Sequence, residues 1–133
     1  MAKTVLCHGC FDPFHYGHLL HFEAARKYGA RLVVAVTRDK FVNKGPSRPA
    51  FSQKQRAKVI RSLRCVDKVI LANDSIDAMR RAKPAVFVKG AEYTEAMRPE
   101  DAAYALAHGI RVVFTDTEKF SSTKLLAHES FAR

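Results

Sequence analysis

Two histidines and a glycine, His15, Gly17 and His18, are the residues of this sequence best suited to chemistry. They follow a short apolar run and precede a helical pattern, which places them between a first strand and a first helix. Imidazole N–H groups can donate to phosphate oxygens, glycine lets a phosphate approach the backbone, and a helix N-terminus attracts anions. The expected chemistry is therefore stabilisation of negative charge that develops on a phosphorus centre.

A loop after the predicted second strand supplies a lysine for the same chemistry. Lys44 stands beside Gly45 in the irregular stretch 38–51 and is well suited to a triphosphate. Arg48 and Arg56 follow it, and either arginine contacts an acceptor or orients the loop. Asp12 is interpreted as a turn residue that caps the first loop, with placement of Mg²⁺ as the alternative.

Two later stretches add candidate binding residues. Lys89 and Gly90 end the predicted fourth strand, where Glu92 and Tyr93 can reach a sugar hydroxyl or a base edge. The run Ser121-Ser122-Thr123 opens the predicted last helix, and its hydroxyls and free N–H groups form a second anion site. Because ligands bind at the carboxyl ends of strands in an open α/β sheet, these loops are expected to meet.

The elements that position these residues follow from the hydrophobic pattern. Short apolar runs alternate with helical patterns, which predicts strand–helix units, an α/β fold and an open parallel five-stranded sheet flanked by helices. The runs are rich in Val and Ile, which is typical of strands buried on both faces. Strands are predicted at Thr4–Cys7, Arg31–Thr37, Val66–Leu71, Ala85–Lys89 and Ile110–Thr115. Helices are predicted at Gly17–Tyr28, Gln53–Arg64, Ile76–Ala82, Glu100–His108 and Ser122–Phe131.

The ends of three predicted helices carry capping residues. Ser52 and Gln55 are interpreted as a capping box, and Gly29 and Gly109 as helix C-terminal caps.

The cysteines near the first loop leave two other readings open. Cys7 and Cys10 form a Cys-x-x-Cys, which is typical of a redox site, and with His15 and His18 they could be four zinc ligands. Both readings are disfavoured, because Cys7 falls in a strand that should be buried and is better interpreted as a small core residue.

Composition and charge restrict the partners. The 23 Lys and Arg residues exceed the 13 Asp and Glu residues and give a formal net charge of +10, which favours phosphorylated ligands or polyanions. A basic nucleic-acid-binding module is therefore an alternative, although no RNA-binding aromatic motif or recognition helix is found. Three cysteines, no signal-peptide pattern and no apolar run of membrane-spanning length lead us to expect a cytoplasmic protein without a membrane partner.

The stretch from Gly9 to His18 closely resembles the HxGH signature of the nucleotidyltransferase superfamily. The chain as a whole resembles the small cytidylyltransferase-like group, which includes glycerol-3-phosphate cytidylyltransferases and heptose-phosphate adenylyltransferases. The heptose group looks closer, and the shared motifs are Ser47-Arg48-Pro49, Gln55-Arg56, Val66-Asp67 and the stretch 88–93. Asp116 stands where the glycerol-phosphate group has an arginine at the nucleotide, which favours ATP over CTP.

This resemblance implies a single Rossmann-like nucleotidyltransferase domain over residues 1–133. Its members transfer a nucleoside monophosphate from a nucleoside triphosphate to a sugar or polyol phosphate and release pyrophosphate. It implies that His15 and His18 stabilise the transition state, that Lys44 holds the triphosphate, and that Mg²⁺ binds through the triphosphate without direct protein ligands. A homodimer is also expected, and an inactive nucleotide-sensing relative is the remaining alternative. The implied nucleotide-binding residues are Gly9, Cys10, Phe11, Gly17, Lys89, Gly90, Glu92, Ser121, Ser122 and Thr123.

Overall fold

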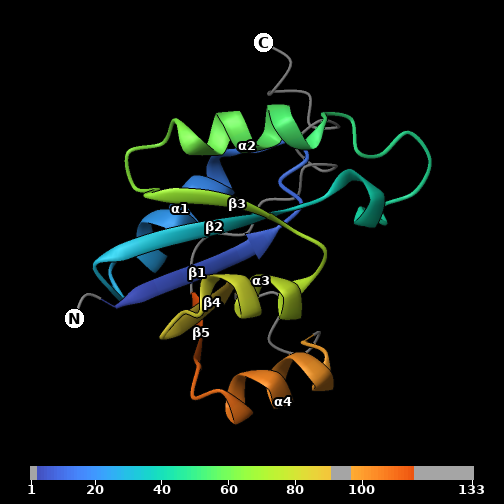
Figure 1. The fold of residues 1–133 in the computed structure, drawn as a ribbon. Helices are drawn as coiled ribbons and strands as arrows, with labels where there is room; N and C mark the ends of the chain where they lie inside the picture. Colours follow the sequence, from blue (N-terminus) through green and yellow to red (C-terminus); the bar gives the residue numbers. More distant parts are fainter. Residues whose placement is uncertain (1–2, 91–96, 116–133) are drawn as a thin grey trace.

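The computed structural model describes residues 3–90 and 97–115. Five strands in this part of the chain form one sheet in the order β3–β2–β1–β4–β5, and every pairing is parallel (Figure 1). The predicted α/β class and the five-stranded open parallel sheet are confirmed. The strands are β1 (Thr4–Gly9), β2 (Arg31–Thr37), β3 (Lys68–Ala72), β4 (Val86–Gly90) and β5 (Arg111–Thr115).

Helices alternate with these strands along the chain, and a 3-10 turn, Asp39–Phe41, follows β2. None of the helices among the described residues is long and apolar enough to cross a bilayer. The predicted helix Ser122–Phe131 lies outside the described residues. The helices are α1 (Tyr16–Arg26), α2 (Gln53–Arg61), α3 (Ser75–Ala82) and α4 (Pro99–Ala107).

Two of the predicted helix caps are confirmed and one is wrong. Ser52 and Gln55 form the capping box of α2, and Gly109 follows α4 with a φ of +66°. Gly29, however, is not the cap of α1, whose C-cap is Lys27. A Cβ at Gly29 would lie 2.6 Å from the Lys3 carbonyl oxygen, so a glycine here allows close approach to the chain that enters β1.

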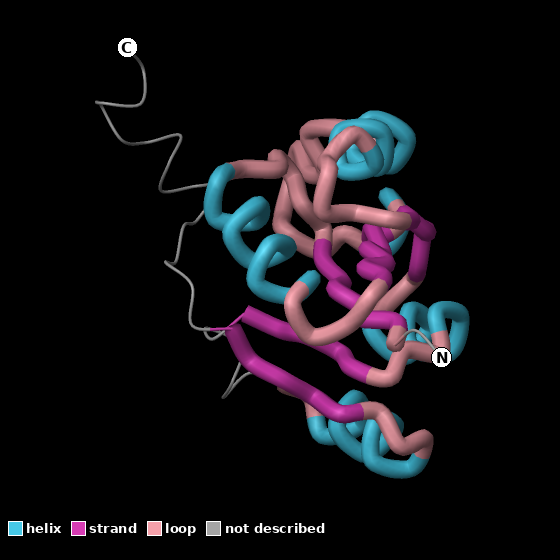
Figure 2. The backbone as a smooth tube through the Cα atoms, turned by 90° about the vertical axis from the view of Figure 1, so that its left-hand side faces the viewer, coloured by secondary structure: helices cyan, strands magenta, loops and turns pink. Residues whose placement is uncertain are grey.

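The helices form two layers that cover the two faces of the sheet (Figures 1 and 2). Phe22 of α1 and Ile60 of α2 pack on one face, against alternate residues of β1, β2 and β4. Met79 of α3 and Ala105 of α4 pack on the other face, with Phe87 of β4. Since alternate residues of a strand point to opposite faces, each inner strand is buried on both sides, as its apolar sequence predicts.

The central strand β1 marks the point where the connections change face. Its neighbours are β2 on one side and β4 on the other, with Val5 opposite Val86 and Leu6 opposite Phe87. The chain passes from β1 to α1 on one face, whereas α4, which comes after β4, lies on the other. Crevices at such a switch point are where open α/β sheets bind ligands. The loop after β1 is therefore the expected place for a site.

Candidate active site

His15 and His18 lie face to face at the start of α1. Their ring centroids are 3.7 Å apart and the rings are 22° from parallel. The Gly17 N–H donates to His15 Nδ1, and the His15 N–H donates to His18 Nδ1, both at 3.1 Å. Because each Nδ1 accepts a hydrogen bond, each neutral ring carries its proton on Nε2. The two rings can therefore act as a pair of Nε2–H donors.

Both rings are held in the neutral form. Burial and the nearby Lys44 ammonium lower the pKa of His15. Burial, the His15 ring and Lys44 together lower the pKa of His18 to about 3. The structure thus brings the three residues that were predicted to be catalytic into one electrostatic group. A neutral imidazole next to a lysine and a helix N-terminus suits a polyanionic ligand that supplies the missing negative charge.

The loop after β1 is held by the fully buried carboxylate of Asp12. Its Oδ2 accepts from Arg48 Nε at 2.8 Å and from the Ala50 N–H at 2.7 Å, and its Oδ1 accepts from the Phe51 N–H at 2.9 Å. The Arg48 guanidinium also donates to the Asp12 carbonyl oxygen. Burial alone would raise the pKa of Asp12, but these hydrogen bonds hold it below its usual range. Asp12 and Arg48 therefore join the first loop to the chain before α2.

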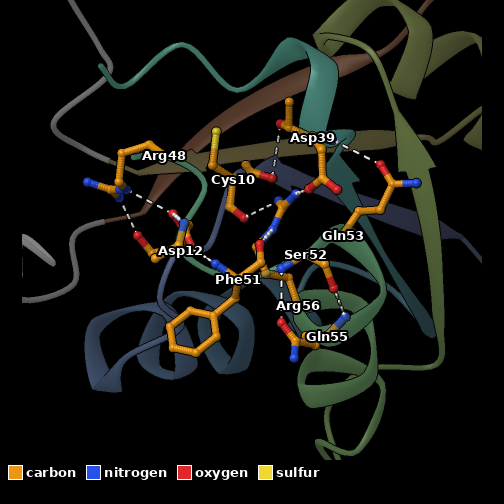
Figure 3. A network of polar contacts seen from close by, with 12 residues as sticks. Cys10, Asp12, Asp39, Arg48, Phe51, Ser52, Gln53, Gln55 and Arg56 are labelled. Carbon is orange, nitrogen blue, oxygen red and sulfur yellow. Dashed lines mark hydrogen bonds and ion pairs between the residues drawn. The ribbon is translucent and has the colours of Figure 1, made fainter. Parts of the chain in front are cut away.

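Arg56 of α2 also connects the loop after β1 to the chain before α2 (Figure 3). Its side chain is buried and donates to the Phe51 carbonyl at 2.9 Å, the Cys10 carbonyl at 2.8 Å and Asp39 Oδ1 at 2.7 Å. We call the side chains of Asp12, Asp39, Arg48 and Arg56, with the backbone they bind, the loop clasp. Of the two roles considered for Arg48 and Arg56, these contacts favour orientation of the loop.

Gly9 and Phe11 are coupled by packing. Phe11 is buried with a φ of +52°, a left-handed conformation that disfavours side chains larger than glycine. Its ring contacts His18 edge-on, with centroids 5.0 Å apart, and a Cβ at Gly9 would lie 2.9 Å from the ring. Glycine at position 9 therefore leaves the space that lets Phe11 support the His18 ring. Gly9 and Phe11, which were predicted to contact a nucleotide, therefore also have a structural role in supporting His18.

Two histidines that the sequence analysis did not select also lie at this edge of the sheet. His8 of β1 hydrogen-bonds Thr37 Oγ1 and Ser75 Oγ, both at 3.0 Å, and Thr37 donates onward to the Gly9 carbonyl at 3.2 Å. His21 of α1 hydrogen-bonds Thr115 Oγ1 at 2.9 Å. Burial lowers the pKa of His8 and of His21 to about 4. The sequence offered two signals for these residues. His8 directly follows the apolar run of the first strand, and His21 lies one helical turn after His18.

Lys89 of β4 acts electrostatically on His8 and His21, whose pKa values its ammonium helps to lower. It lies on the α3 and α4 face of the sheet, where its ammonium is 5.0 Å from the centroid of the Phe87 ring. Burial lowers the pKa of Lys89, while Asp101 of α4 opposes that shift. Gly90 is the last residue of β4, opposite Thr115. Glu92, Tyr93, Ser121, Ser122 and Thr123 lie outside the described residues.

The described residues offer few ligands for a metal ion. They contain no group of three or more His, Cys, Asp or Glu side chains that could hold one. Both oxygens of Asp12 already accept hydrogen bonds from protein groups. Cys7 is buried in β1, where burial and the nearby Cys65 raise the pKa of its thiol far above the usual range. Cys7 is therefore a core residue, as predicted, and a poor redox or zinc thiolate.

Comparison with known proteins agrees with this arrangement. The family model described as cytidylyltransferase-like matches residues 6–127. A protein named bifunctional protein HldE from Gluconobacter oxydans is 41% identical over 129 residues, which cover 94% of this chain and 27% of that protein. The HldE of Methylobacillus flagellatus is 43% identical over 97 residues, which cover 70% of this chain and 20% of that protein. The chain thus spans only about a quarter of the length of these relatives.

A solved structure supports the fold independently. The lipopolysaccharide core biosynthesis protein of Thermoplasma volcanium superposes with a TM-score of 0.73 at 27% identity, over 91% of this chain and all of that one. The family model extends from β1 to beyond β5, so it includes the histidine pair, Lys44 and the loop clasp. The chain belongs to the cytidylyltransferase-like family.

Proposed function

We propose that this protein transfers a nucleoside monophosphate from a nucleoside triphosphate to the phosphate of a sugar or polyol and releases pyrophosphate. ATP is the favoured nucleotide, and CTP is the alternative. The observation that carries the proposal is the stacked pair His15 and His18, with both Nε2–H donors beside Lys44 at the N-terminus of α1. The relatives named HldE and lipopolysaccharide core biosynthesis protein support a sugar phosphate as the acceptor.

The chemistry asks little of the protein beyond position and charge. An ionised acceptor phosphate oxygen attacks the α-phosphorus, a new P–O bond forms, and the bond to the pyrophosphate oxygen breaks. No proton is gained or lost in this exchange. His15 and His18 donate hydrogen bonds to oxygens that gain charge in the transition state, and Lys44 offsets the charge of the triphosphate. The loop clasp holds the backbone before His15 in place.

Mg²⁺ fits this proposal only as a partner of the nucleotide. The carboxylate nearest the histidines in the loop, Asp12, is fully engaged, and the described residues contain no cluster of metal ligands. The ion would therefore be held by triphosphate oxygens, where it would offset part of their negative charge. We further propose that the protein works in the cytoplasm, where nucleoside triphosphates are supplied, and that it works as a homodimer.

A pyrophosphate-release assay with Mg²⁺ tests the reaction. ATP, CTP, GTP and UTP are each paired with sugar 1-phosphates, including heptose 1-phosphate, and with glycerol 3-phosphate. We expect release with one nucleotide–acceptor pair, and the nucleotidyl product confirmed by mass spectrometry. The proposal would be overturned if no pair released pyrophosphate and the same protein bound none of the four nucleotides in calorimetry. Light scattering of the same sample tests the dimer.

A further inference from the structure

His21 joins the helix of the phosphate site to the two strands on the far side of β1. It lies on α1, one helical turn after His18. Its Nδ1 is 2.9 Å from Thr115 Oγ1, with which it hydrogen-bonds. Thr115 is buried and donates weakly to the Lys89 carbonyl, at 3.4 Å. We call His21, Thr115 and the Lys89 carbonyl the histidine tie.

The tie acts where the chain leaves β4 and β5. Gly90 ends β4 directly opposite Thr115, which ends β5. A single imidazole thus connects the helix that carries His18 to the ends of these two strands.

We propose that His21 is a positioning residue that fixes the phosphate-binding start of α1 relative to the ends of β4 and β5. The inference rests on the proposed function, since it concerns the same site. His21 contacts the end of β5 through Thr115, which in turn contacts the end of β4, and His21 lies beside the buried Phe22 of the core rather than within it. Its loss should therefore misplace binding groups more than it empties the core.

Nucleotide affinity of the full chain is the direct test. Titration calorimetry with ATP and CTP would compare wild type with His21→Leu, Thr115→Val and the double variant. We expect His21→Leu to raise the Kd about tenfold while kcat stays within about threefold. Thr115→Val should raise the Kd in the same direction, and the double variant should be no worse than His21→Leu, because both remove one contact. His21→Asn places an amide near the position of Nδ1 and should recover part of the affinity.

The exposed His108 provides the matched control, and His108→Leu should bind nucleotide like wild type. A purely structural role for His21 would lower the melting temperature of His21→Leu and leave its Kd within twofold of wild type, which would overturn the inference. Wild type that binds nucleotide but turns over no acceptor would overturn the proposed function alone, because the Kd series still tests His21. Wild type that binds no nucleotide would overturn both.

Discussion

The two sides of the site are held by different kinds of interaction. On the β2 side, the loop clasp uses two buried or partly buried ion pairs, Arg48 with Asp12 and Arg56 with Asp39, together with hydrogen bonds to loop backbone. On the β4 and β5 side, the histidine tie uses a hydrogen bond between one neutral imidazole and Thr115. The clasp therefore costs much to break, whereas the tie is weaker, and burial makes a protonated ring unfavourable there.

The largest expected effect is on the clasp. Asp12→Ala leaves the Arg48 guanidinium and two backbone N–H groups without their buried acceptor, so the free energy of unfolding should fall by about 3–5 kcal/mol. Urea denaturation measures the change. Glu100→Ala is the matched control, because its ion pair with Arg98 joins two side chains that are 56% and 52% exposed, and its loss should cost no more than about 1 kcal/mol. Equal losses in the two variants would contradict the central place of Asp12.

Arg56→Lys should have the next largest effect. An ammonium cannot reach the three acceptors that the planar guanidinium binds, so the Cys10 and Phe51 carbonyls lose their charged donor. We expect a loss of about 2 kcal/mol in the free energy of unfolding, measured by urea denaturation. Lys54→Met on the exposed side of the same helix should change stability by less than about 0.5 kcal/mol. A tolerated Arg56→Lys would mean that the guanidinium geometry is unimportant.

The pH dependence separates the two sides. Unfolded histidines bind a proton near pH 6.5, whereas burial lowers the folded pKa of His8 and His21 to about 4. Their contribution is therefore complete above pH 6.5 and is lost as pH falls towards 4, by about 1.4 kcal/mol per pH unit for each histidine. The pKa of Asp12 lies below its usual value of 3.8, so Asp12 stays ionised in this range.

Urea denaturation at pH 6.5 and pH 5.0 checks this expectation. Wild type should lose stability between the two pH values, and His8→Asn and His21→Asn should each lose less. Hydrogen exchange at pH 5.0 should show Thr115 opening before Phe51, because opening lets His21 take up a proton at this pH, whereas Asp12 gains none. An unchanged slope in both variants would contradict the neutral state of these histidines.

The sequence predicted the fold well and the site in part. Helix and strand boundaries follow local patterns, and for the elements within residues 3–90 and 97–115 the predicted ends lie within three residues of the observed ones. The order of the strands depends on contacts between distant segments, so local patterns do not specify it. The structural preference for Asp12 was sound, but its partners Ala50 and Phe51 donate through their backbone, which residue identity does not reveal.

His8 and His21 show the same limit. Each is an isolated histidine next to apolar residues, and nothing local indicates that Thr37 or Thr115 will lie beside it in the fold. The spacing of His18 and His21 was a usable signal that His21 lies near the site, since residues three apart share a face of a helix. Gly9 was selected for a nucleotide, and its described neighbours are the Phe11 ring and the Thr37 hydroxyl.

The stacked histidine pair is the central claim, and pyrophosphate release by His18→Ala tests it most directly. The variant should lose about 10²–10³ in kcat with the nucleotide–acceptor pair that wild type uses, because one Nε2–H donor to the transition state is gone. His108→Ala, which removes an exposed histidine, should match wild type. A folded His18→Ala with the kcat of wild type would contradict the account.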